Sequence, residues 1–321
     1  MISWHANMEK LAYLTPYLRD ESIREILIHN QNFFQIEKNQ LLEDGGETGL
    51  SARDYQSSLE ILALQNQVEW NYKKPFTSFF IRLANIRFRA SLVHFSITAS
   101  HSSKLFLRRL NEQAFSLNSF TKEEYFITFL KNAILQKKNI LISGATGSGK
   151  TALLSSLVNT IPPKEHVVVL EDTFEIPILN QRHTRLLSEN TSGKTLEDYC
   201  AYSLRIRPDR IILGEMRSKE TIPFLLAMNT GHQGLISTVH ANSAVESLSR
   251  LAALSLFYQS KKEMNFSNIM RLICQGLDYV IHLNKRRIIK IIHILGNEKD
   301  RPFFEEIDKK DSYNPLREKN H

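Results

Sequence analysis

The chain has 321 residues, more than one hydrophobic core usually supports, so we expect two domains. A hydrophobic content of 42% supports a globular protein. The formal net charge is +7, from 41 Lys and Arg against 34 Asp and Glu. This moderate basic bias fits an anionic membrane surface or nucleic acid as a partner, and a general abundance of lysine explains it equally well.

Cysteine content and hydropathy narrow the class further. Cys200 and Cys274 are the only cysteines and form no C-x-x-C pair, so the sequence signals neither a zinc site nor a disulfide framework. No stretch approaches about 18 uninterrupted apolar residues, and the N-terminus lacks a basic leader followed by an apolar core. We therefore expect a protein of the reducing cytosol that neither spans a membrane nor is exported.

The first part of the chain, residues 1–110, is expected to form a small α+β domain. Residues 23–29 and 33–37 predict a β-hairpin. Residues 52–67 carry apolar side chains near helical spacing, which predicts a helix. Residues 86–97 alternate apolar and polar side chains, as a strand with one buried face does.

Residues 111–120 have no sustained periodicity and are expected to form a linker. A helix start follows, because Thr121 and Glu124 have the spacing of a capping box, in which the two side chains satisfy free N–H groups reciprocally. This helix is expected to run to Lys138.

From Asn139 onward, apolar strands alternate with helical patterns, which predicts a doubly wound α/β sheet. Each strand ends where polar residues begin, and open α/β sheets bind ligands at such ends. The predicted strands are residues 140–143, 167–170, 211–213 and 235–239. Residues 279–294 then predict a hairpin around the basic segment 284–287.

Residues 144–151 read Gly-Ala-Thr-Gly-Ser-Gly-Lys-Thr, a full G-x-x-x-x-G-K-[ST] match between a predicted strand and a predicted helix. Glycines at these positions let backbone N–H groups turn inward onto a phosphate at a helix N-terminus. Lys150 is expected to reach the β- and γ-phosphates, and Thr151 to hold Mg²⁺. The predicted nucleotide-binding residues are Gly144, Ala145, Thr146, Gly147, Ser148, Gly149, Lys150 and Thr151.

Hydrolysis of a nucleotide also needs an oriented water and neutralisation of the charge that develops on the γ-phosphoryl group. Residues 210–215 form an apolar strand that ends in the carboxylate of Glu215, the Walker B arrangement, with Gly214 where many such motifs carry aspartate. We expect Glu215 to polarise the water or to hold Mg²⁺ through one. The alternative is a surface glutamate that merely follows the strand.

A second acidic segment, Glu171-Asp-Thr-Phe-Glu175, follows the strand at 167–170. Parallel strands place their C-terminal ends on one edge, so Glu171, Asp172 and Glu175 are expected beside the glycine loop, sharing the metal and the water. The pattern leaves open which of these carboxylates, or Glu215, acts as the general base. An ordinary acidic loop is the alternative.

The strand at 235–239 leads into His240, within Asn229-Thr-Gly-His-Gln-Gly and Thr238-Val-His-Ala-Asn-Ser243. A neutral imidazole there can accept from or donate to phosphate-bound water. A lone histidine at a strand end otherwise has a structural role.

Four blocks thus follow one another along the chain: the glycine loop 144–151, the acidic segment 171–175, the Walker B strand 210–215 and the histidine segment that ends at Ser243. As an ordered set they resemble the secretion traffic ATPases, the RecA-like hexameric motors of type IV secretion, conjugation, type II secretion and pilus assembly. Residues 207–210 and the histidine segment look most like the VirB-type branch of type IV secretion and conjugation and the tight-adherence branch. No tetracysteine zinc element is present, which disfavours the type II secretion branch. Glycine at 214 is usual in this superfamily.

The resemblance implies a C-terminal RecA-like P-loop NTPase domain with a mainly parallel sheet over residues 121–321, beside the smaller N-terminal α+β domain. It implies ATP and Mg²⁺ as ligands and a homo-oligomer, expected to be a hexamer. The implied partners are inner-membrane components of a secretion apparatus, with no direct nucleic-acid recognition. The implied location is cytoplasmic, peripheral on the inner face of the cytoplasmic membrane.

The resemblance also implies that arginines of the N-terminal domain contact the nucleotide phosphates, since a planar guanidinium spreads charge over phosphate oxygens. Arg87 and Arg108 fit this role, and Arg89 and Arg109 are adjacent candidates. Asn85 is followed by Ile86, whereas the family pattern has a glycine after this asparagine. Solvated arginines on the outer face of a strand are the alternative.

The function that follows is a hexameric ATPase motor that powers type IV secretion or conjugative transfer of macromolecules across the bacterial envelope. A pilus-assembly ATPase of the tight-adherence type is an alternative with the same chemistry. A nucleic-acid translocase is a second alternative, suggested by the RecA-like core and the net charge of +7. A nucleotide-gated scaffold without turnover is a third.

Overall fold

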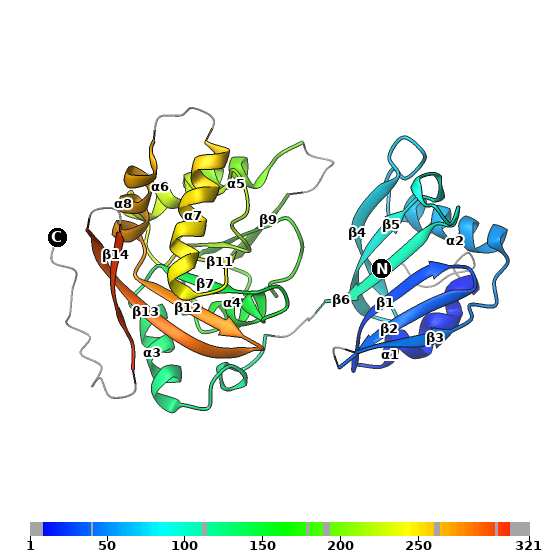
Figure 1. The fold of residues 1–321 in the computed structure, drawn as a ribbon, viewed down its shortest axis with the longest axis horizontal. Helices are drawn as coiled ribbons and strands as arrows, with labels where there is room; N and C mark the ends of the chain where they lie inside the picture. The colour runs from blue at the N-terminus through cyan, green and yellow to red at the C-terminus, as the bar shows by residue number, and fades with distance from the viewer. Residues whose placement is uncertain are drawn as a thin grey trace. The chain divides into compact units, whose positions relative to one another are not determined.

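The computed structural model describes residues 9–39, 41–110, 114–177, 180–188, 193–259, 264–298 and 301–308. The chain divides into two compact units, Met1–Glu112 and Gln113–His321, which we call the N-terminal and C-terminal units and describe separately (Figure 1). The expected linker 111–120 differs from this division, because Leu117 and Phe120 are buried in a core of the C-terminal unit. These two apolar side chains thus place residues 117–120 in the core of that unit, while residues 111–113 lie outside the described part of the chain.

The N-terminal unit contains an antiparallel sheet, six-stranded among the described residues, in the order β3-β2-β1-β6-β5-β4. Its elements are η1 (Glu9–Leu14), α1 (Thr15–Arg19), β1 (Ile23–Asn30), β2 (Phe33–Lys38), β3 (Leu41–Gly46), α2 (Ala52–Gln65), β4 (Phe76–Leu83), β5 (Ile86–Val93), η2 (Phe95–Ile97) and β6 (Lys104–Arg109). The predicted hairpin β1–β2 and helix α2 are confirmed. The predicted strand 86–97 is shorter, ending at Val93.

Alternation along the strands gives this sheet one buried face. On β5, Phe88, Ala90 and Leu92 are buried, and they share a core with Tyr55 and Leu59 of α2. Residues at intervals of three and four lie on the same face of a helix, which is why the apolar stripe of α2 can cover the sheet.

The C-terminal unit contains a sheet that is eight-stranded among the described residues, in the order β14-β13-β12-β7-β11-β10-β8-β9. The strands from β12 to β9 in this order are parallel, while β13 and β14 are antiparallel additions, so the predicted α/β class with a mainly parallel sheet is confirmed. Its elements are η3 (Leu117–Ser119), α3 (Glu124–Leu135), β7 (Ile140–Gly144), α4 (Lys150–Val158), β8 (Val167–Glu171), β9 (His183–Leu187), α5 (Leu196–Ser203), β10 (Arg210–Leu213), α6 (Thr221–Asn229), β11 (Ile236–His240), α7 (Ala244–Tyr258), α8 (Phe266–Gly276), β12 (Tyr279–Asn284), β13 (Arg287–Glu298) and β14 (Arg301–Glu306).

The predicted capping box at the start of α3 is wrong. The helix begins at Glu124, and its N-cap residue Glu123 makes no side-chain cap. The hydroxyl of Thr121 instead accepts from the backbone N–H of Glu123 at 3.2 Å, a shorter-range bond that competes with the helical one. The helix ends at Leu135, before Lys137 turns to a φ of 55°.

Helices cover both faces of the parallel sheet (Figure 1). Helices α5 to α8 enclose one core with Leu141 and Val168, and α3 and α4 enclose another with Ile140 and Ile142. Strands buried on both faces need continuous apolar runs, which is the pattern that β7 and β8 carry. None of the helices in the described part of the chain combines the length and hydropathy that crossing a bilayer requires.

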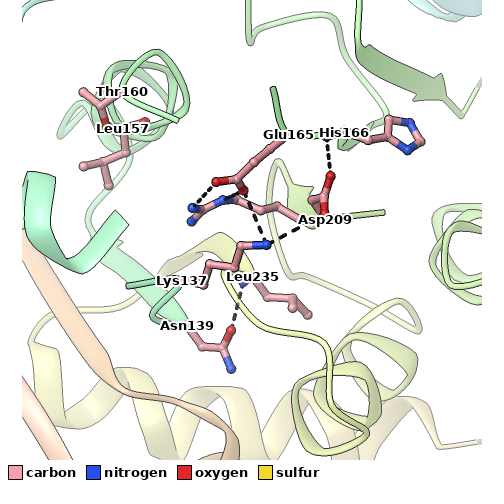
Figure 2. Close-up of polar contacts among 9 residues, drawn as sticks. Lys137, Asn139, Leu157, Thr160, Glu165, His166, Asp209 and Leu235 are labelled. Carbon is pink, nitrogen blue, oxygen red and sulfur yellow. Dashed lines mark hydrogen bonds and ion pairs between the residues drawn. The ribbon is translucent and has the colours of Figure 1, made fainter. Parts of the chain in front are cut away.

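A buried ion pair anchors the start of β10. The guanidinium of Arg210, whose side chain is 0% exposed, donates from Nε and Nη2 to the two carboxylate oxygens of Glu165 at 2.6 and 3.1 Å. Lys137 extends between Glu165 and Asp209, 3.8 Å from each, and Asp209 accepts from the backbone N–H of His166 (Figure 2). These charges tie together the segments that precede β7, β8 and β10.

The opposite edge of the sheet collects the strand ends that the sequence predicts to be functional. His240 at the end of β11 pairs with Gly144 at the end of β7, and Leu213 of β10 pairs with Leu170 of β8. Because these strands are parallel, the polar residues that follow them emerge on one edge.

Candidate active site

The glycine loop 144–151 lies between β7 and α4, as the sequence predicts. Gly147 and Gly149 have φ values of 72° and 95°, which residues with a Cβ atom rarely adopt. A Cβ atom on Gly147 would meet nothing within 4 Å, so the loop borders open space. Backbone N–H groups at the start of a helix beside such a space suit an anion such as phosphate.

Lys150 is buried at the start of α4, with 6% of the residue exposed. Its Nζ donates to the carbonyl oxygens of Gly144 at 3.1 Å and Ala145 at 2.9 Å. Burial lowers the pKa of Lys150, while the carboxylates of Glu215 and Glu175 act to raise it. The ammonium group thus donates hydrogen bonds to two loop carbonyls, and phosphate oxygens could take their place as acceptors.

Three side chains from different elements form a row at this edge. Nδ1 of His240 lies 3.0 Å from Nζ of Lys150, and its Nε2 lies 2.9 Å from Oε1 of Glu215. An ammonium group only donates, so Nδ1 accepts and the ring hydrogen lies on Nε2, which donates to Glu215. Burial and the charge of Lys150 lower the pKa of His240, in agreement with a neutral ring. We call this arrangement the Lys150–His240–Glu215 row.

Strand β11 positions Glu215. The hydroxyl of Thr238 donates to the carbonyl of Gly214 at 2.8 Å, and the carbonyl of Thr238 accepts from the N–H of Met216 at 2.8 Å. Burial raises the pKa of Glu215, and the charge of Lys150 acts in the opposite direction. A half-buried carboxylate with raised basicity is suited to accept a proton from water.

Glu171 has a different environment from the one expected of a catalytic base. It is 3% exposed, and its Oε1 accepts from the backbone N–H groups of Glu175 and Ile176 at 2.9 and 2.8 Å. Its Oε2 lies 3.0 Å from Nε of Arg185, whose guanidinium stacks over the ring of Phe174. Burial raises the pKa of Glu171 to about 7. Both oxygens are thus engaged in holding the acidic loop, which makes Glu171 a positioning residue.

The other two carboxylates of the acidic segment have separate partners. Asp172 forms an ion pair with Arg217. Glu175 is half-buried. Its charge opposes the lowering of the pKa of Lys150 and adds to the raising of the pKa of Glu215, so Glu175 lies near the row. The structure therefore brings Glu215, His240 and Glu175 to the lysine of the loop and turns Asp172 toward an arginine.

Gly214, where many Walker B motifs carry aspartate, lies beside Glu171. A Cβ atom at 214 would lie 3.4 Å from Cγ of Glu171, in ordinary contact. An aspartate here would place a second carboxylate next to a buried one, and like charges in one site oppose ionisation of both. The glycine is thus compatible with the charge that Glu171 supplies at the end of the neighbouring strand.

The expected metal ligands are few. Thr151 is the second residue of α4, beside Lys150. Mg²⁺ keeps several waters and is usually held by one or two protein groups together with substrate phosphates. A threonine hydroxyl and a carboxylate reached through water, as predicted for Thr151 and Glu215, match that preference.

Two features of the site are absent from the sequence motifs. Arg185 lies on β9, a strand that the sequence pattern did not predict because all five of its residues are only half-buried. The turn between β12 and β13 meets the glycine loop, where the N–H of Arg286 donates to the carbonyl of Ser148 at 2.9 Å. The basic residues of 284–287 were the only available signal for this second feature.

The predicted arginines of the N-terminal unit lie on strands of its sheet. Arg87 is on β5, next to buried Phe88, and Arg108 is on β6, 3.5 Å from Glu25. Arg109, an adjacent candidate, donates to the backbone carbonyls of three residues of the same unit and thus has a structural role. A nucleotide contact by Arg87 and Arg108 stays a prediction.

Taken together, the fold and the site define a class. A mainly parallel sheet with helices on both faces, and a glycine loop between strand and helix, make the C-terminal unit a RecA-like P-loop domain. The family described as "Type II/IV secretion system protein" matches residues 66–294, which is more than half of the chain. The chain belongs to this family.

Individual relatives agree with the assignment. Protein VirB11 of Agrobacterium fabrum is 34% identical over 157 residues, covering 48% of this chain and 46% of that protein. Conjugal transfer protein TrbB of Rhizobium radiobacter is 34% identical over 174 residues, covering 52% and 51%. The matches to these relatives therefore span about half of their length. The solved structure of the pilus retraction motor PilT with bound ADP is similar in fold, with a TM-score of 0.65 and 19% identity over 92% of this chain and 81% of that one.

Proposed function

We propose that this protein is an ATP-hydrolysing motor subunit that powers type IV secretion or conjugative transfer. The Lys150–His240–Glu215 row carries the proposal, because it joins the lysine of the phosphate loop to a half-buried carboxylate through a neutral histidine. Membership of the secretion family and the similarity to TrbB support the choice of process.

In the proposed reaction, the oxygen of a water molecule bonds to the γ-phosphorus of ATP, and the bond from that phosphorus to the β,γ-bridging oxygen breaks. Glu215 accepts the proton of the water, and His240 orients Glu215 through its Nε2–H. Lys150 leaves the loop carbonyls and neutralises charge on the β- and γ-phosphates. Thr151, with Glu215 acting through water, would hold Mg²⁺, which would neutralise further charge on the phosphates.

We further propose a homo-oligomeric ring, expected to be a hexamer, that works in the cytoplasm on the inner face of the membrane. Its partners would be inner-membrane components of the secretion apparatus, without direct recognition of nucleic acid. Arg87 and Arg108 are proposed to contribute charge to the phosphates. Arg87→Ala and Arg108→Ala should each slow turnover, and an equal effect from Arg89→Ala would contradict the choice of these two positions.

The test of the chemistry is Lys150→Ala. Phosphate release from ATP by the full chain should fall at least about 100-fold, because the variant loses the cation that stabilises the transferring group. Turnover unchanged by the substitution would overturn the assignment. Turnover stimulated strongly by DNA at low salt would favour a translocase instead.

The test of the process is identification of partners captured with the tagged chain from native membranes. Recovery of inner-membrane secretion or conjugation components is expected. Recovery of pilus-assembly components would replace secretion by the tight-adherence alternative, although the chemistry of the site would be unchanged.

A further inference from the structure

The turn between β12 and β13 has a backbone conformation that its residues disfavour. Lys285 and Arg286 have φ values of 44° and 60°, and they connect Asn284 to Arg287, which face each other across the hairpin. A two-residue hairpin with positive φ at both positions normally uses Asn and Gly. Residues other than glycine keep such φ values only where the surrounding structure holds them there, and they are concentrated at functional sites.

The surroundings of this turn are the phosphate loop. The N–H of Arg286 donates to the carbonyl of Ser148 at 2.9 Å, and Leu283 pairs with Gly144. A Cβ atom on Gly149 would come within 2.9 Å of Cγ of Arg286. The side chain of Arg286 therefore leaves the turn directly over the residue that precedes α4, where a phosphate is expected to bind.

The guanidinium of Arg286 is also oriented. Its Cζ lies 5.5 Å from the ring centroid of Phe115, which packs edge-on against buried Phe120. The N–H of Ile288 donates to the carbonyl of Phe120 at 3.0 Å, tying the hairpin to the same segment. An exposed, planar cation beside an aromatic ring can stack on a nucleobase or pair with phosphate oxygens.

Strand order indicates which part of the nucleotide meets Arg286. Strand β7 lies between β11 and β12. His240 ends β11, and Glu215 follows β10 on the same side, so the Lys150–His240–Glu215 row marks the γ-phosphate end. Arg286 follows β12, on the opposite side of the loop from that row.

We propose that the β12–β13 turn is an outer wall of the nucleotide site, and that Arg286 binds the part that nucleoside di- and triphosphates share. That part comprises the base, the ribose and the phosphates nearest to them. The inference rests on the proposed function, and it adds a binding residue that lies outside the four sequence motifs. Arg286 contributes to affinity and takes no part in breaking the phosphate bond.

The experiment measures affinity of the full chain for ADP and for a non-hydrolysable ATP analogue by calorimetry. Arg286→Gly removes the side chain and supplies the residue that positive φ favours, so it should raise the melting temperature by about 2 °C without nucleotide. The Kd for both nucleotides should nevertheless rise by the same factor, about tenfold or more, as for loss of a charged hydrogen bond. Arg287→Ala, the neighbouring exposed arginine, is the matched control and should change either Kd less than about twofold.

Steady-state kinetics of ATP hydrolysis provide a second test of the role of Arg286. Because the contact is the same in the ground state and the transition state, Arg286→Gly should raise KM for ATP and leave kcat unchanged. Unchanged affinity for both nucleotides, or a loss confined to the triphosphate, would overturn the inference. Failure of the unsubstituted chain to bind ADP would instead overturn the proposed function.

Discussion

At the residue scale, His240 holds a tautomer that its two neighbours determine. Lys150 can only donate, so the ring hydrogen must lie on Nε2 and point to Glu215. A second proton on His240 would place two cations 3.0 Å apart. Burial and the charge of Lys150 lower the pKa of the histidine, and this lowering favours the neutral ring. The row therefore carries its proton toward the carboxylate that is proposed to activate water.

The carboxylate of Glu215 can be tested without removing its bulk. Glu215→Gln keeps an oxygen that accepts from His240 but cannot take a proton from water, so kcat should fall at least about 100-fold. The Kd for ADP should change less than about threefold. Asp172→Asn is the comparison, because Asp172 is paired with Arg217, and it should cost less than about tenfold in kcat. An equal loss in both variants would move the base away from Glu215.

Glu171 predicts a pH dependence of stability. Burial raises its pKa from an ordinary value of 4.5 to about 7, so between these values the folded protein binds a proton that the unfolded chain releases. Its contribution to stability is therefore present below the lower value and is lost as pH rises to about 7, by at most about 1.4 kcal/mol per pH unit. Denaturant unfolding of the native chain and Glu171→Gln should show the native chain losing stability relative to the variant as pH rises. A difference that is constant with pH would contradict this.

At the element scale, strand β10 is fixed at both ends. Its start is held by the ion pair between Arg210 and Glu165, and Thr238 of β11 fixes the chain just after its end. Nη1 of Arg210 lacks a hydrogen-bond partner among the described residues and lies against Gly234. Because β10 has only four residues, small shifts at its start would be transmitted to Glu215.

The ion pair at the start of β10 is expected to matter for stability. Arg210→Ala leaves Glu165 without its buried cation, and loss of one partner of such a pair costs about 3 kcal/mol or more. Lys137→Ala removes a partly exposed cation 3.8 Å from the same carboxylate and should cost less than about 1 kcal/mol. Chemical denaturation measures both. Equal losses would mean that the buried pair is not the anchor.

At the scale of the whole molecule, the two units have separate cores. One cluster of buried residues lies within the N-terminal unit, and two others lie within the C-terminal unit, on either side of its sheet. Every residue of the glycine loop and of the Lys150–His240–Glu215 row belongs to the C-terminal unit. A unit with its own core can fold alone.

A fragment of residues 114–308 tests this independence. It should unfold in one cooperative thermal transition with a far-ultraviolet circular dichroism spectrum of a mixed α/β domain. It should also bind ADP, since it contains the whole glycine loop. A fragment beginning at 121 is the comparison, and it should be less stable because it lacks Leu117 and Phe120, which are buried in the core. Equal stability of the two fragments would mean that residues 114–120 contribute nothing to the core and act as a linker.

The sequence by itself determined the features that depend on neighbouring residues. The order of glycines in 144–151 dictates a strand, a loop and a helix, and continuous apolar runs predict strands buried on both faces. The family resemblance followed from motifs of this local kind, and the match over residues 66–294 agrees with it.

Only the tertiary structure decided which contacts, and hence which roles, the predicted residues have. Glu171 and Glu215 both follow apolar strands, yet one is turned onto a loop and Arg185 while the other meets His240. Arg286 reaches the glycine loop only because β12 is placed next to β7. Such roles depend on strand order and on contacts between residues far apart in the chain, and periodicity along a sequence carries no record of which strands become neighbours.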